Sequence, residues 1–143
     1  MKELEENLKL YQEQYTNYPF LFFYGLGNGI LYKALLKNTL HKRIIIIEKE
    51  LDIIFITLNL IDFSEDLFKG RIIITHTLDY NNNIAELIFG LTEISLFLKT
   101  YQINLHSPFY RIYQEDIKKI NNINLQTIKY LTLKKVQILW MLW

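Results

Sequence analysis

Three glycines alternate with other residues directly after a short apolar run, in the sequence FLFFYGLGNG. The run is Phe20–Tyr24, and the glycines are Gly25, Gly27 and Gly29. A helical pattern follows at once, giving the order strand, tight turn and helix that opens a Rossmann-type sheet. Glycine accepts positive φ and lets a ligand or a neighbouring helix approach the backbone, and amide groups at a helix start suit an anion.

An acidic residue follows at the distance at which nucleotide-binding Rossmann units hold ribose hydroxyls. Glu48 ends the run RIIIIE, about 20 residues beyond the glycines. The spacing G-x-G-x-G is closer to the methyltransferase-like variant than to G-x-G-x-x-G. We therefore expect Gly25, Gly27, Asn28, Gly29 and Glu48 to line a pocket for S-adenosylmethionine or a nucleotide. The alternative is that the glycines only permit close packing of helix on strand.

Two histidines are weaker candidates for chemistry. His76 follows the third expected strand and is placed to line the same crevice, although a loop histidine is the simpler interpretation. His106 adjoins Ser107, but no third group is placed to orient a catalytic pair, so we interpret it as a turn histidine.

The elements that must position these residues follow an α/β pattern. Short apolar runs predict strands at Phe20–Tyr24, Arg43–Ile47 and Ile72–Thr75, and the second and third of these are rich in β-branched residues. Their apolar character on both faces favours a Rossmann-like parallel sheet with helices on both faces. Helices are expected at 4–15, 29–37, 51–61, 64–70, 84–97 (with a break near Gly90) and 109–131. The sheet is thus preceded by an N-terminal helix and followed by a long C-terminal helix, with 99–110 irregular.

Composition limits the class of protein. The chain has 143 residues, half of them hydrophobic, which is enough for one domain with its own core. A net charge of +1 argues against nucleic acid or an anionic membrane as partner. The absence of cysteine excludes disulfides and thiolate metal sites. No apolar run approaches the roughly 20 residues of a membrane span and the N-terminus is not signal-like, so we expect a cytoplasmic protein.

Three longer stretches resemble the N-terminal domain of the motility accessory factor (Maf) proteins, flagellin glycosyltransferases of Campylobacter and Helicobacter type. They are FLFFYGLGNGILYKALLKN, HKRIIIIEKELDIIFITLNLIDFSEDLFKGRIII and LHSPFYRIYQEDIKKIN. The resemblance covers roughly Leu10 to Lys134, and its first two stretches are more specific than a bare glycine motif.

The resemblance implies a role in flagellin glycosylation. Family members transfer pseudaminic acid, legionaminic acid or a related nonulosonic acid from its CMP-activated form to Ser/Thr of flagellin, which filament assembly and motility require. This activity is assigned to a central domain beyond the region that the chain resembles, so no catalytic residue is carried over. Only the GLGNG turn and Glu48 match an N-terminal motif. The resemblance thus implies a truncated chain with flagellin, the missing transferase domain, or a nucleotide or nucleotide-sugar as partner.

The last eight residues, 136–143, differ from the domain expected at 1–135. They read VQILWMLW, where family members continue with a glycine and polar residues. One back-translation reads Gly-Thr-Asn-Ser-Val-Asp-Ala-Leu in the neighbouring frame, so we hypothesise that residues after Lys135 are out of frame. The alternative is a genuine hydrophobic tail that packs on the domain. An exposed tail would favour self-association.

Two other functions remain open from the residues alone. One is a small S-adenosylmethionine- or nucleotide-binding enzyme that uses Gly25–Gly29 and Glu48. The other is a non-catalytic interaction module, in which the glycines serve packing.

Overall fold

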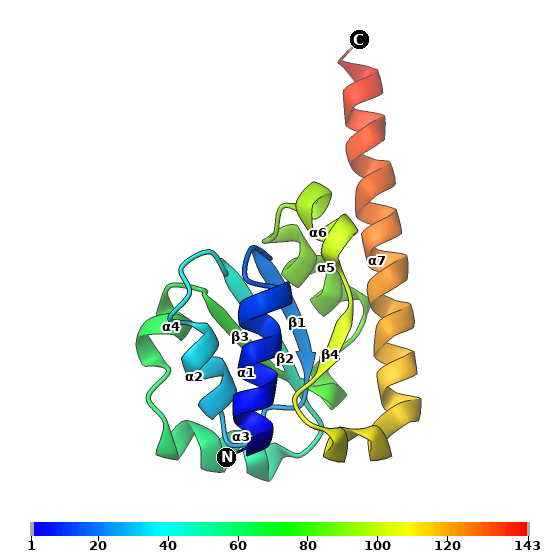
Figure 1. Ribbon diagram of the computed structural model, residues 1–143. Helices are drawn as coiled ribbons and strands as arrows, with labels where there is room; N and C mark the ends of the chain where they lie inside the picture. Colours follow the sequence, from blue (N-terminus) through cyan, green and yellow to red (C-terminus); the bar gives the residue numbers. More distant parts are fainter. Residues whose placement is uncertain (1, 143) are drawn as a thin grey trace.

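The computed structural model describes residues 2–142, and it confirms the expected α/β fold (Figure 1). The described residues form a four-stranded parallel sheet in the order β3-β2-β1-β4. The strands are β1 (Phe20–Tyr24), β2 (Arg43–Glu48), β3 (Ile72–His76) and β4 (Ile103–Leu105). The chain runs outward from β1 to β3 and then returns to add β4 on the other side of β1. This reversal of strand order is the switch point at which Rossmann-like sheets bind ligands.

Helices cover both faces of the sheet, as the apolar strands predicted. The α-helices are α1 (Lys2–Gln14), α2 (Ile30–Leu35), α3 (Leu51–Leu60), α4 (Ser64–Phe68), α5 (Asn82–Gly90), α6 (Ile94–Thr100) and α7 (Gln114–Met141). Two 3₁₀ helices are η1 (Thr77–Asp79) and η2 (Pro108–Tyr113).

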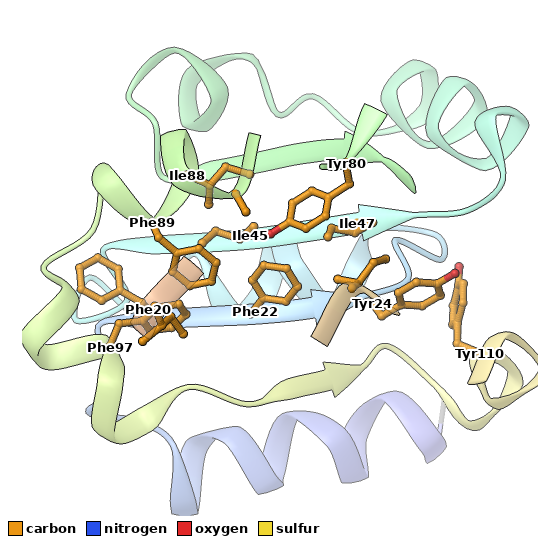
Figure 2. Close-up of a cluster of buried hydrophobic side chains, with 13 residues drawn as sticks. Phe20, Phe22, Tyr24, Ile45, Ile47, Tyr80, Ile88, Phe89, Phe97 and Tyr110 are labelled. Atoms are coloured by element: carbon orange, nitrogen blue, oxygen red, sulfur yellow. The ribbon is translucent and has the colours of Figure 1, made fainter. Parts of the chain in front are cut away.

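Alternate residues of β1 point into two separate cores. Phe20, Phe22 and Tyr24 face a core with α5, α6 and α7, which Figure 2 shows in close-up. Leu21 and Phe23 face the other core, with α1, α2 and α3. All five residues are buried, because side chains of a strand alternate between faces and here both faces are covered.

The sequence interpretation missed β4. Residues 99–110 were expected to be irregular, but Ile103–Leu105 pair with β1, with Phe22 opposite Ile103 and Tyr24 opposite Leu105. The strand has three residues in a mixed polar stretch, so its pairing with β1 decides its conformation rather than its own propensity. The segment after it also differs from expectation, because a 3₁₀ helix occupies 108–113 and the α-helix begins only at Gln114.

Helix α7 is longer than expected and projects from the domain (Figure 1). Within its described part, buried side chains end at Ile128, yet the helix continues to Met141 without a break at Lys135. Residues 136–142 therefore extend α7 into solvent instead of folding back on the domain.

Candidate functional site

The glycine-rich turn joins β1 to α2 at the carboxyl edge of the sheet. Gly25, Gly27 and Gly29 all have positive φ, at 103°, 56° and 78°. The turn is fixed to the sheet because the Gly25 amide donates to the Ile47 carbonyl at 2.7 Å. L-residues rarely adopt such φ values, so the backbone path itself requires glycine here.

Glu48 lies against this turn, as the sequence spacing predicted. It ends β2, and none of its surface is exposed to solvent. Its Oε1 accepts from the Leu26 amide at 2.9 Å and from the Tyr110 hydroxyl at 2.5 Å, and its Oε2 accepts from the Glu50 amide at 2.9 Å. The carboxylate is therefore surrounded by three donors of the protein itself.

Two aromatic rings from the segment after β4 cover the turn. The Gly27 amide donates to the Tyr110 hydroxyl oxygen at 3.0 Å. A Cβ added to Gly25 would lie 2.4 Å from the Tyr110 ring, and one added to Gly27 would lie 2.2 Å from the His106 ring. The glycines thus make room for these rings as well as for the turn conformation. Figure 2 shows Tyr110 beside Tyr24, at the end of β1.

The carbonyl groups of the turn are also bonded within the protein. Thr57 of α3 donates its hydroxyl to the Gly27 carbonyl at 2.7 Å, and the Tyr32 hydroxyl donates to the Gly25 carbonyl. Since buried backbone groups need partners, these bonds fix the turn from the side of α2 and α3.

Tyrosine–carboxylate bonds fasten the segment from η2 to α7 over the sheet edge. The hydroxyl of Tyr24 donates to Asp116 at 2.6 Å, and that of Tyr113 donates to Glu50 at 2.9 Å. With the bond from Tyr110 to Glu48, three such bonds join the ends of β1 and β2 to residues 110–116. Burial and Glu48 raise the pKa of the Tyr110 hydroxyl, so it stays protonated and donates at neutral pH.

A small pocket of about 180 Å³ opens beside the turn, at the β1/β4 switch point. Its polar lining includes Asn28 of the turn, His106 and Ser107 after β4, and Glu3 and Asn7 of α1. The Asn28 side chain accepts from the Ile30 amide at 3.1 Å, which supports the start of α2.

Burial favours the neutral form of His106, and one of its ring nitrogens lacks a hydrogen-bond partner. Burial lowers the pKa of His106, against the opposing effect of the Glu48 and Glu3 carboxylates. Its Nδ1 is buried without a hydrogen-bond partner. Its ring packs on the turn and lines the pocket, and Ser107 beside it lines the same pocket.

His76 lies elsewhere. It ends β3, pairs with Glu48 in the sheet register, and donates its Nε2 proton to the Lys49 carbonyl at 2.8 Å. It is not part of the pocket beside the turn.

The structure thus brings together the five predicted residues, Gly25, Gly27, Asn28, Gly29 and Glu48, around one turn. Sequence reasoning missed the rings of Tyr110 and His106, which approach the turn from the far end of the chain. Their only sequence signal is indirect: they lie beside Ser-Pro, shortly after the three residues that prove to be the strand beside β1.

The fold and site define a Rossmann-like α/β domain in which side chains from another segment of the same chain cover the glycine turn. Comparisons with protein-family models, curated proteins and solved structures gave no match. Between residues 2 and 142, no helix combines the length and apolar character needed to cross a membrane. The same residues contain no cluster of three or more His, Cys, Asp or Glu side chains suited to a metal ion.

Proposed function

We propose that this chain is a non-catalytic domain equivalent to the N-terminal domain of Maf flagellin glycosyltransferases. In this role it binds flagellin or the transferase domain that transfers a nonulosonic acid from its CMP-activated form to flagellin. The resemblance of residues 10–134 supports this function. The Rossmann-like sheet also agrees with the fold that the resemblance implies.

The proposal that the domain is non-catalytic rests on the closure of the glycine turn. The Leu26 and Gly27 amides, which a phosphate would need, already donate to Glu48 and to Tyr110. The ring of Tyr110 fills the space over Gly25, where a nucleotide would approach the backbone. These contacts favour a turn that holds the domain together over a turn that holds a cofactor.

The test combines a transfer assay with a binding assay. We expect the chain alone to transfer no sugar from a CMP-activated nonulosonic acid to flagellin, and to bind immobilised flagellin or a Maf transferase domain in biolayer interferometry. Sugar transfer by the chain alone would refute the non-catalytic role. If the chain binds neither protein, the interaction role is refuted.

A second candidate is a small enzyme or sensor that binds S-adenosylmethionine or a nucleotide. The pocket beside the turn favours it, because ligands of Rossmann-like sheets bind at the strand switch point. Calorimetric titration with S-adenosylmethionine, CMP and NAD separates the two candidates. Saturable binding that is lost in Asn28→Ala supports the second one. Asn28 suits this variant because it lines the pocket, while its hydrogen bond to Ile30 is exposed.

A further inference from the structure

We propose that the projecting end of α7 pairs antiparallel with the same segment of a second copy, forming a two-fold symmetric dimer. The projecting segment is defined here as residues 132–142. This dimer goes beyond the proposed function, because the surface that forms it lies outside the sheet and the glycine turn (Figure 1).

From Val136 to Leu142, the projecting segment exposes apolar side chains on every side, and Gln137 is its one polar residue there. Trp140, Met141 and Leu142 expose 78%, 86% and 78% of their surface, and Leu133, Val136, Ile138 and Leu139 are about half exposed. No charged residue occurs from Val136 to Leu142 in the printed sequence. A helix that is hydrophobic all round is normally buried, and a short isolated helix is marginal in water. The segment therefore needs a partner surface.

The apolar surface of the segment contributes to a dimer interface together with a groove at its base. Taking each fully exposed large side chain as up to 250 Å², the exposed apolar part of the segment amounts to about 800 Å² over all its sides. Each partner of a standard-size interface buries about 800 Å², so a helix pair, which buries only the facing sides, needs further contact from that groove. A second copy supplies an equal surface of the same apolar character, as a two-fold interface requires.

Charges favour the antiparallel direction. Lys134 and Lys135 stand at the base of the segment, and the tip at Trp140–Leu142 is uncharged. A parallel pair would place the lysines of both copies side by side. An antiparallel pair instead brings each lysine pair next to the carboxyl end of the other helix, where positive charge is favoured. The antiparallel arrangement thus avoids like-charge contact and gains a dipole interaction.

A groove at the base of the segment gives the tip a place to pack. Phe89, Gly90, Ile94, Leu131 and Lys135 belong to its lining, and its volume is about 390 Å³. A Cβ added to Gly90 would find no atom within 4 Å, so this part of the groove is open. If two segments cross at Gln137, the tip of each reaches the base of the other, because the distance from Gln137 to either end is only about 7.5 Å along the helix.

The oligomeric state is the first test. At tens of micromolar, we expect the wild-type chain to sediment as a dimer and Trp140→Glu to sediment as a monomer with unchanged far-UV circular dichroism. The matched control is Phe68→Glu on α4, because Phe68 is 92% exposed and lies on another part of the molecule. It should leave the dimer intact. A monomeric wild type, a dimeric Trp140→Glu variant, or assemblies that grow beyond the dimer would each overturn the proposal.

Cross-linking tests the direction, since the chain contains no cysteine. With copper phenanthroline as oxidant, Gln137→Cys should form a disulfide-linked dimer, whereas Phe68→Cys should not. A mixture of Leu133→Cys and Met141→Cys should give mainly the mixed disulfide, because these positions face each other in an antiparallel pair. Disulfides that join 133 to 133 and 141 to 141 instead would overturn the antiparallel arrangement.

Discussion

Replacing Glu48 with glutamine keeps the shape of the side chain but removes an acceptor from the closed turn. The carboxylate accepts from Leu26, Tyr110 and Glu50, and it is fully buried. The NH₂ group of a glutamine cannot accept, so at least one of these donors loses its partner. A hydrogen bond to a charged group contributes about 1.5–3 kcal/mol, and the bonds that remain become neutral. We therefore expect Glu48→Gln to lower the free energy of unfolding by about 2–4 kcal/mol.

Urea unfolding followed by far-UV circular dichroism measures this loss. Tryptophan fluorescence is unsuitable, because Trp140 lies on the projecting segment, away from the sheet. Glu50→Gln is the matched control: Glu50 accepts from Tyr113 at the surface, so its loss should stay within about 0.5 kcal/mol. Combining Glu48→Gln with Tyr110→Phe should give a coupling energy of about 1–2 kcal/mol, because the two side chains share a hydrogen bond. Equal losses for Glu48→Gln and Glu50→Gln would refute the role assigned to Glu48.

Other variants test the turn, a buried histidine and the long helix. Gly25→Ala should lower the free energy of unfolding, measured in urea, by about 2–3 kcal/mol, because Gly25 has a positive φ and an added Cβ would meet a buried ring. Gly90→Ala, at an open helical position, should leave this free energy unchanged or raise it. Burial lowers the pKa of His41 below 6.5, so its contribution to the free energy of unfolding is constant above pH 6.5 and is lost as the pH drops below it. His106 acts in the same direction, so His41→Gln should reduce the slope below pH 6.5 without abolishing it. Asn124→Leu should lower the free energy of unfolding by about 2–4 kcal/mol in the same assay. The buried Tyr80 hydroxyl would lose its acceptor, and the Tyr101 hydroxyl would lose the donor Asn124 while it keeps its bond to Asn121. A loss under 1 kcal/mol would contradict this.

The parts of the fold that the sequence predicted are those with strong local signals. β1 and β2 follow from apolar runs of β-branched and aromatic residues, and the boundaries of β1 agree with the structure. The turn follows from the alternating glycines, and its contact with Glu48 follows from the parallel pairing of β1 with β2. Each of these signals lies within the first 48 residues of the chain.

The parts that could not be predicted depend on contacts between distant segments. Nothing near Tyr110 in the sequence indicates that it covers a turn 83 positions away. β4 is specified mainly by the edge of β1 that it completes, and its three residues carry little propensity of their own. Whether the turn binds a ligand stays a prediction that the titrations above will decide.

The separation between the turn and the rings that cover it also bears on how the protein is made. The strands β1, β2 and β3 are synthesised before Tyr110, because translation proceeds from the N-terminus. Until then, the Leu26 and Gly27 amides and the Glu48 carboxylate face water or a passing solute. The nascent chain therefore carries an open glycine turn that the finished protein no longer presents.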